Sequence, residues 1–288
     1  MDISIVIPTY NGKHLLNVSL PHLYRLIPDN ISHEIIVVDN GSTDGTDLVV
    51  SRQSSVVSQY IKLQHNYGFT RAVNEGIKKA RGTYVLILNN DCFVEKDTIA
   101  ALYTFLEKNN NYVATQPIIQ TQQGDIESIG YVVDLKKGKA EVVRSEKMLK
   151  QVFDHEAQTE SVQHDTSKMW GMGRVYGLSA TCLLIRKDII EKVGMFDESF
   201  HSYLEDVDLF IRLASQGYKY APCLSVSAKH VHMGTSSKMN SYKEQKDLLN
   251  WIRIIRKNYP QSFIMNNICS LLLERLRNMS GLLKALLS

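Results

Sequence analysis

Cysteine is scarce in this chain: its 288 residues include four cysteines (Cys92, Cys182, Cys223 and Cys269), and no two of them form a CxxC pair. That spacing supports neither a zinc ribbon nor a disulfide scaffold. An excess of charge of one sign is also missing, because 33 Lys and Arg face 30 Asp and Glu and leave a net charge of +3. Such a balance gives no broad electrostatic attraction to nucleic acid. We therefore expect reduced thiols and no nucleic-acid partner.

Long apolar runs are absent as well. No stretch approaches the roughly 18 apolar residues that a membrane-spanning helix needs, and the first residues lack the basic start and apolar segment of a secretory signal. The composition, with 44% hydrophobic and 22% charged residues, is that of an ordinary globular protein. We expect a cytoplasmic protein with one large domain or two closely joined ones.

The first hundred residues alternate between short buried strands and helices. Apolar, β-branched runs and helical spacing predict strands at 3–7, 34–39, 60–63 and 84–88, and helices at 13–27, 70–81 and 96–108. This alternation is typical of an α/β fold with a parallel sheet covered on both faces. In such sheets ligands bind at the carboxyl ends of the strands. Polar side chains stand at four of these ends, at 9–11, 39–42, 65–68 and 89–91.

The second half of the chain has a different pattern. Residues 136–168 are polar, and we expect them to form an exposed excursion. Residues 263–288 predict an amphipathic helix with a broad apolar face and a mainly basic polar face. Such a tail can dock on its own domain or on a second copy in a homodimer, or it can lie in the interface of the inner membrane face as a peripheral contact. The sequence leaves these alternatives open.

Each polar motif is weak by itself, since residues 39–46 lack the Lys of a phosphate loop and the others can be simple turns. Taken in order, Pro8–Asn11, Val38–Asp44, Asn66–Phe69 and Leu88–Asp91 resemble the nucleotide-binding half of the family 2 glycosyltransferases, which have the GT-A fold. Four later segments resemble the rhamnosyltransferase-like branch of that family: 183–187, 193–198, 203–209 and 232–236. The resemblance covers roughly residues 3–260.

The resemblance implies an α/β GT-A fold with a Rossmann-like, mostly parallel sheet. Residues 1–115 would form its nucleotide-sugar half, 116–260 its acceptor-binding and catalytic half, and 261–288 the helical tail. The implied activity is inverting transfer of a sugar from a UDP- or dTDP-sugar to a hydroxyl of a glycan or lipid-linked glycan. A divalent metal, Mn²⁺ or Mg²⁺, would assist this reaction, and surface-polysaccharide assembly would be its setting.

Residues at the four strand ends match donor-binding positions of the family. They are Pro8, Thr9, Tyr10, Asn11, Asp39, Ser42, Asn66, Gly68, Phe69, Arg71, Asn74, Asn89 and Asn90. Asp39 matches the acid that accepts a hydrogen bond from the imide N–H of uracil or thymine, and Arg71 or Asn74 would lie near the phosphates. The alternative for Asp39 is a helix cap.

Asp91 stands where the family carries the second acid of its DxD motif and is therefore the expected metal ligand. The first acid is replaced by Asn89, which would weaken metal binding, and a plain turn is the alternative for 89–91. His232 matches a further ligand, and His230 is the second choice.

Three acids stand together at Glu205, Asp206 and Asp208. Asp206 matches the catalytic base of the family, and Glu205 would position the acceptor. Helix capping is the alternative, above all for Asp208.

Trp170, Tyr176 and Gly177, together with His230, are expected to line the acceptor or sugar pocket, with core burial an equal alternative for Trp170. Two other functions compete with glycosyl transfer. A sugar-1-phosphate nucleotidyltransferase would need a Gly-rich basic loop after the first strand, which residues 8–13 do not supply. A catalytically weak nucleotide-sugar-binding subunit would follow from the loss of the first DxD acid.

Overall fold

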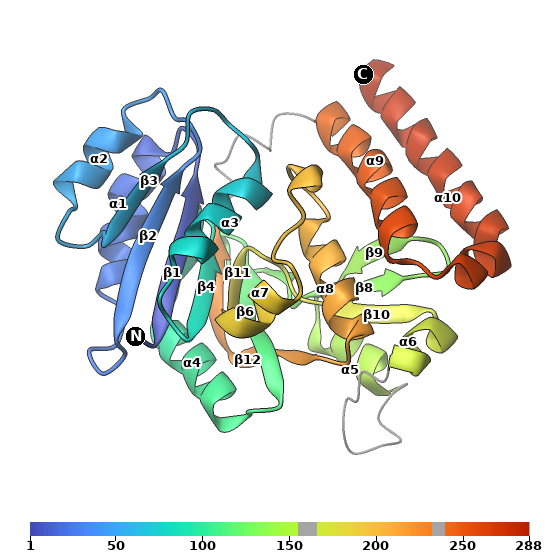
Figure 1. The fold of residues 1–288 in the computed structure, drawn as a ribbon, viewed down its shortest axis with the longest axis horizontal. Coiled ribbons are helices and arrows are strands. Elements are labelled where there is room, and N and C mark those ends of the chain that lie inside the picture. The colour runs from blue at the N-terminus through green and yellow to red at the C-terminus, as the bar shows by residue number, and fades with distance from the viewer. Residues whose placement is uncertain (155–165, 232–239, 288) are drawn as a thin grey trace.

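The computed structural model describes residues 1–154, 166–231 and 240–287. Within them, a nine-stranded sheet with helices on both faces forms the centre of the molecule (Figure 1). Its strand order is β3-β2-β1-β4-β11-β6-β12-β5, and β7 pairs with β6. These strands are β1 (Ile3–Thr9), β2 (His33–Asp39), β3 (Gln59–Lys62), β4 (Tyr84–Leu88), β5 (Cys92–Val94), β6 (Tyr112–Gln120), β7 (Ile126–Ser128), β11 (Cys182–Arg186) and β12 (Lys219–His230).

Strand direction decides which chain segments meet at the edge of the sheet. β1 is parallel to β2 and β4, whereas β11 is antiparallel to both β4 and β6 and places Cys182 opposite Leu88. β12 is parallel to β6. The carboxyl ends of β1, β2, β4 and β12 and the start of β11 therefore lie along one edge. The expected α/β fold with a mostly parallel sheet is confirmed.

Ten α-helices lie within the described residues. They are α1 (Lys13–Tyr24), α2 (Thr46–Arg52), α3 (Phe69–Lys79), α4 (Thr98–Lys108), α5 (Glu146–Asp154), α6 (Thr166–Met172), α7 (Lys187–Lys192), α8 (Glu205–Ser215), α9 (Asn240–Asn258) and α10 (Gln261–Leu287), and a short 3₁₀ helix, η1, spans Glu198–Phe200. Alternate strand residues face two separate cores. Ile5 and Ile7 pack with α1 and α4 on one face, and Val6 packs with α3 on the other.

A second, three-stranded sheet has the order β10-β8-β9 and comprises β8 (Tyr131–Asp134), β9 (Lys139–Val142) and β10 (Arg174–Gly177). It corrects the expectation of an exposed excursion at 136–168. Residues 139–154 form β9 and α5, and Val143 and Leu149 are buried in the core. The short, polar strand β9 carries little apolar signal, so composition alone hid it. Residues 155–165 lie outside the described part.

The C-terminal helices α9 and α10 pack against each other as a hairpin beside α8 (Figure 1). The predicted helix in the tail is confirmed, and it continues through Gly281. In the described ranges, none of the helices combines the length and the apolar character needed to cross a bilayer.

Candidate active site

The loops that follow β1, β2 and β4 are joined by hydrogen bonds at one edge of the sheet. The amide N–H of Asn11 donates to Ser42 Oγ at 2.8 Å, and the amide of Thr43 donates to Asn11 Oδ1 at 2.9 Å. The side chain of Asn90 donates to Thr9 Oγ1 at 2.8 Å. The polar strand ends therefore converge, as the parallel arrangement requires.

Asn40 connects the loop after β2 to residues 66–68. Its amide nitrogen donates to Asn66 Oδ1 at 2.9 Å and to the carbonyl of Gly68 at 3.0 Å, while its oxygen accepts from the amide of Tyr67 at 2.9 Å. Sequence reasoning gave Asn40 no role of its own. Its position directly after the acid at the end of a buried strand is the feature of the sequence that could have indicated this role.

Asp39 lies at the end of β2 and has no exposed surface. One carboxylate oxygen accepts from the amide of Ser42 at 2.8 Å, and the other accepts from the hydroxyl of Tyr60 at 2.5 Å. In this structure Asp39 therefore shapes the loop that follows it. Contact with a nucleobase requires the Tyr60 hydroxyl or this loop to move, and the predicted base contact stays a prediction.

Two other donor-loop residues differ in exposure. Pro8 is buried in the sheet, whereas Tyr10 is 37% exposed at its edge.

The loop that begins α3 contacts the segment that leads to α8. The amide of Phe69 donates to the carbonyl of His201 at 2.7 Å. Gly68 has φ +91°, and a Cβ there would lie 2.5 Å from the same carbonyl, so glycine permits this approach. Arg71 is exposed, lies over the ring of Tyr67 and pairs with Glu198 at 3.4 Å. The donor loops and the acidic segment are thus one connected unit.

Asn74 is held by the chain itself in this structure, and its predicted place near the phosphates stays a prediction. Asn74 is 2% exposed, and its amide donates to the carbonyl of Phe196 at 2.8 Å while its oxygen accepts from the amide of Phe196 at 3.1 Å. A side chain held in this way fastens α3 to the segment before η1. Helical position alone could not distinguish the two roles.

The backbone before the acid pair is strained. Three residues that are not glycine have positive φ angles: His201 at 60°, Tyr203 at 67° and Leu204 at 63°. Such conformations persist where surrounding contacts hold them, and they gather at functional sites. Here the buried Asn250 of α9 donates to the carbonyls of Ser202 and Tyr203 at 2.9 and 2.7 Å. The first turn of α8 is positioned by this held segment.

Glu205 and Asp206 begin α8 and differ in the hydrogen bonds that their carboxyl groups receive. Asp206 accepts from the amide of Val207 at 2.8 Å and from the backbone of Ala180. Glu205 Oε2 is buried and has no hydrogen-bond partner among the described residues. Burial raises the pKa of Asp206 to about 6, and burial together with the charge of Asp206 raises the pKa of Glu205 to about 8. At neutral pH the pair therefore holds a carboxylate beside a protonated acid.

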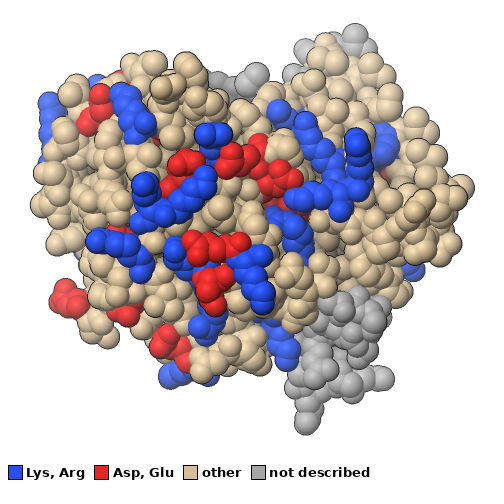
Figure 2. Space-filling model, viewed as in Figure 1, with Lys and Arg blue, Asp and Glu red and all other residues tan. Residues whose placement is uncertain are grey.

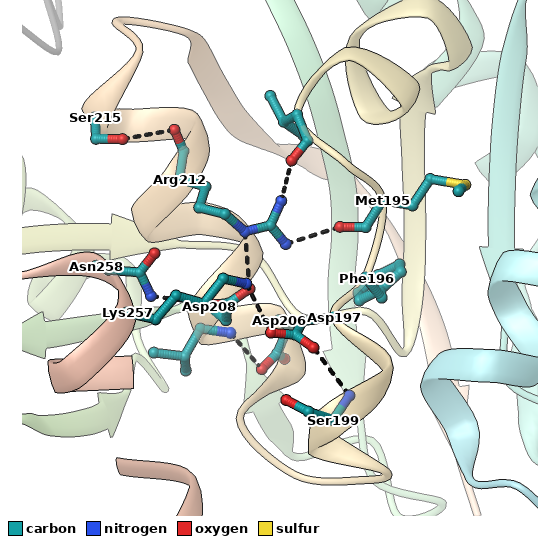
Figure 3. A network of polar contacts seen from close by, with 12 residues as sticks. Met195, Phe196, Asp197, Ser199, Asp206, Asp208, Arg212, Ser215, Lys257 and Asn258 are labelled. Carbon is teal, nitrogen blue, oxygen red and sulfur yellow. Dashed lines mark hydrogen bonds and ion pairs between the residues drawn. The ribbon is translucent and has the colours of Figure 1, made fainter. Parts of the chain in front are cut away.

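Asp208 belongs to a structural network rather than to the reactive edge (Figure 3). It has no exposed surface and accepts from Arg212 Nε at 2.8 Å, Asn258 Nδ2 at 2.8 Å and Lys257 Nζ at 3.4 Å. Arg212 also donates to the carbonyls of residues 193 and 195. Asp208 thus joins α8 to α9 and to the loop before η1.

Asp91 and His230 lie together where β4 and β12 end. His230 Nε2 is 3.3 Å from Asp91 Oδ1, and its Nδ1 is 3.1 Å from Glu127 Oε1. Burial lowers the pKa of His230, but the hydrogen bonds and charges of Asp91 and Glu127 outweigh it and raise the pKa to about 9. Sequence reasoning missed Glu127, which joins the site from β7. His232 lies outside the described residues.

The side chains around Asp91 bear on the metal that the sequence predicts. The two carboxylates approach different nitrogens of the same imidazole, and no three His, Cys, Asp or Glu side chains of the described residues form a group that could hold an ion. Asn89 is half-buried, and its backbone carbonyl accepts from the amide of Cys92. The described side chains alone thus do not fit a complete metal site, and the acid at the end of β4, Asp91, is in contact with His230.

The expected acceptor-pocket residues are mostly built into the core. Tyr176 is 3% exposed, and its hydroxyl donates to the carbonyl of Ile129. Gly177 is buried, and a Cβ there would lie 2.4 Å from the ring of Tyr131. In this structure both residues are therefore part of the core, and their predicted pocket role stays a prediction. The hydroxyl of Tyr131, which sequence reasoning also missed, is buried and has no hydrogen-bond partner among the described residues. Burial, followed by the nearby charge of Asp206, raises the pKa of Tyr131.

Trp170 packs against Tyr259 and Phe263, with ring centroids 5.1 and 4.9 Å apart. Packing between α6 and the C-terminal helices is thus its role in this structure.

Comparison with known proteins identifies the class to which this fold and site belong. The model of the family described as glycosyl transferase family 2 matches residues 4–194. The chain belongs to this family and is a glycosyltransferase by sequence.

Individual relatives agree with this assignment. An uncharacterized glycosyltransferase of Rickettsia typhi is 27% identical over 268 residues, which are 91% of this chain and 74% of that protein. The low-salt glycan biosynthesis hexosyltransferase Agl10 of Haloferax volcanii is 25% identical over 233 residues, 80% of this chain and 67% of its own. The mannosyltransferase PcManGT of Pyrobaculum calidifontis, solved with GDP-Man and Mn²⁺, aligns with a TM-score of 0.64 at 17% identity over 98% of this chain and 72% of that one. This last similarity supports the GT-A fold.

Proposed function

We propose that this protein transfers a hexosyl or rhamnosyl group, with inversion, from a UDP- or dTDP-sugar to a hydroxyl of a glycan or lipid-linked glycan. One observation carries the proposal. The carboxylate of Asp206 stands beside the unsatisfied acid of Glu205 on a segment that is bonded to the donor loops through His201 and Phe69. A base next to a nucleotide-binding edge is the arrangement that direct displacement requires.

In the proposed step, Asp206 accepts the proton of the acceptor hydroxyl as its oxygen attacks the anomeric carbon. The bond between that carbon and the phosphate oxygen breaks on the opposite face, and the nucleoside diphosphate leaves with the bonding electrons. Protonated Glu205 donates a hydrogen bond with its buried Oε2 group and positions the acceptor. The raised pKa of Asp206 makes it a stronger base than an ordinary aspartate while it is still ionised at neutral pH.

The donor lies across the edge formed by residues 8–11, 39–42, 66–69 and 89–91 in this proposal. Asp39 would select uracil or thymine by accepting from the imide N–H, and this contact needs the Tyr60 hydroxyl to turn away. Because the structural relative PcManGT was solved with GDP-Man, guanine donors belong in the test.

A divalent cation, Mn²⁺ or Mg²⁺, is proposed to enter with the donor. Such ions are commonly held by one or two carboxylates together with substrate phosphates, which suits a site where the described chain supplies Asp91. The cation would neutralise charge on the departing diphosphate. PcManGT was solved with Mn²⁺, and His232 remains a predicted further ligand.

The acceptor class and the setting in surface-polysaccharide assembly are proposed from relatives, because Agl10 is named for low-salt glycan biosynthesis. The acceptor would approach from the side of Glu205, and the protein would work in the cytoplasm.

A panel of UDP-, dTDP- and GDP-sugars with Mn²⁺ or Mg²⁺ tests the proposal. We expect hydrolysis or transfer from a uracil or thymine donor, with the opposite anomeric configuration in the product by NMR. Asp206→Asn should lower kcat by about 10²- to 10⁴-fold while donor binding persists. Full transfer by that variant would overturn the assignment of the base, and a panel without turnover would overturn the proposed activity.

A further inference from the structure

Helix α10 exposes a continuous row of apolar side chains. Each member is at least 39% exposed: Met265, Ile268, Leu272, Leu276, Met279, Leu283 and Leu286. Their spacing of three and four residues places them within a sector of roughly 80° on a helix of 3.6 residues per turn. A contiguous exposed apolar surface of this kind marks an interaction site.

The side of α10 that adjoins the apolar row attaches the helix to the molecule. Leu271 is 3% exposed, and Arg275 is 9% exposed. The guanidinium of Arg275 lies 5.3 Å from the ring of Trp251 on α9 and donates to the carbonyl of Gly138 between β8 and β9. The outer row is therefore presented by a helix that is already anchored on its inner side.

Charge distinguishes the α9–α10 hairpin from the rest of the chain. Residues 240–287 contain eight Lys and Arg but three Asp and Glu, although the whole chain has a net charge of +3. The three acids are turned inward, since Glu244 and Asp247 are half-buried and Glu274 is 7% exposed. Arg277 and Lys284 are both exposed on one side of α10, about 100° and 80° around the helix from the nearest edge of the apolar row, and Arg277 pairs with Glu274 at 2.9 Å. Figure 2 shows further Lys and Arg gathered over α9 beside the uncharged surface of α10.

We propose that α10 binds the surface of an anionic bilayer, with its apolar row inserted below the headgroups and the cations of the hairpin among them. Apolar insertion flanked by Lys and Arg is how interfacial helices bind. This inference does not depend on the proposed function.

A second copy of the chain fits the row less well. Pairing along it would bring together two hairpins that each carry eight Lys and Arg against three Asp and Glu over residues 240–287, and one of those acids, Glu274, already pairs with Arg277 of its own helix. Paired helices usually carry complementary charges at these flanks.

Cys269 provides a direct measurement, because it is exposed on α10 while the other three cysteines are buried. The full chain, labelled there with a polarity-sensitive fluorophore, is titrated with phosphatidylcholine vesicles with and without phosphatidylglycerol. We expect a blue shift and brighter emission with the anionic vesicles, and weaker binding at high salt. Arg277→Gln with Lys284→Gln should weaken binding by about fivefold per cation.

Two matched variants test the apolar row. Leu272→Glu with Leu276→Glu should abolish vesicle binding, and Val18→Glu, at a 58% exposed position on α1, should leave it unchanged. Circular dichroism verifies that each variant is folded. Emission that does not respond to anionic vesicles would overturn the proposal. A second copy would be the occupant of the row if two results came together. The native chain would not bind vesicles, and light scattering would show that it is a dimer that the Leu272/Leu276 variant does not form. Asp206→Asn should bind vesicles normally, which separates this result from that of the transfer assay.

Discussion

At the residue scale, the acid pair at the start of α8 combines two protonation states in one place. Asp206 is stabilised by backbone donors, whereas Glu205 Oε2 is buried without a hydrogen-bond partner among the described residues. An isolated buried carboxylate is costly, so Glu205 keeps its proton. The two neighbours can therefore serve as base and donor at the same pH.

The rate of transfer should follow the titration of Asp206. Because the base must be ionised and Glu205 must keep its proton, kcat/KM is expected to rise as the pH passes about 6 and to fall again above about 8. A pH–rate profile measures this when the rates are taken at donor concentrations below KM. A flat profile between pH 5 and 8 would contradict the role of Asp206.

Glu205→Gln should stabilise the protein at alkaline pH. The folded-state pKa of Glu205 is about 8, above its ordinary value, so the unfolded chain ionises first and stability falls as the pH rises from about 4.5 to 8. Removing this acid is expected to add on the order of 3 kcal/mol above pH 8, or a Tm about 5 °C higher, and to change little at pH 4. Calorimetry at both pH values measures the change in Tm. Asp125→Asn, which removes an exposed acid, is the control and should not change the Tm. An equal shift at both pH values would show that the effect is not one of titration.

At the scale of elements, side-chain amides and one buried acid determine how the loops and helices are joined. Asn40 connects two donor loops, Asn74 connects α3 to the segment before η1, and Asp208 connects α8 to α9. Each of these residues lies far along the chain from its partners. Their roles are therefore visible in three dimensions only.

Asp208→Asn is expected to destabilise the fold rather than to change the chemistry. The substitution leaves Arg212 and Lys257 without their buried carboxylate, and breaking such a pair costs about 3–5 kcal/mol. Urea denaturation should show this loss, in contrast to Asp206→Asn, which should keep its stability and lose turnover. The comparison is matched because the two acids lie two residues apart on one helix. Equal losses of stability would contradict the division of roles.

Asn40→Ala should raise the KM for the donor. The substitution removes three hydrogen bonds that hold residues 66–68 against the loop after β2, each worth about 1 kcal/mol. We expect a KM increase of roughly tenfold with a smaller change in kcat. Asn30→Ala, an exposed position after α1, is the control. An unchanged KM would show that the donor does not depend on this loop contact.

Much of the first half of the fold could be predicted because β1, β2 and β4 are short apolar runs with no other reasonable interpretation. The convergence of the strand ends follows from their parallel direction. The exact partners could not be predicted, since Glu127 meets His230 across 103 residues and Asn74 meets Phe196 across 122. β9 escaped prediction because three of its four residues are exposed or polar.

At the scale of the whole molecule, both tryptophans report on the C-terminal hairpin. Trp251 belongs to α9, and Trp170 packs against Tyr259 and Phe263. Because these residues share a core cluster with the sheet, we expect Trp emission and circular dichroism to change at the same urea concentration. An earlier change in Trp emission would show that the hairpin unfolds separately.

The antiparallel strand β11 has a consequence for synthesis of the chain on the ribosome. β4 is complete at residue 88, but the strand that covers its free edge begins at Cys182. At typical elongation rates about 10 s pass before that partner emerges. During this interval the nascent chain presents an apolar strand edge next to the finished donor loops, a state that favours pairing with other chains. Translation speed through residues 89–186 should therefore influence the yield of active protein.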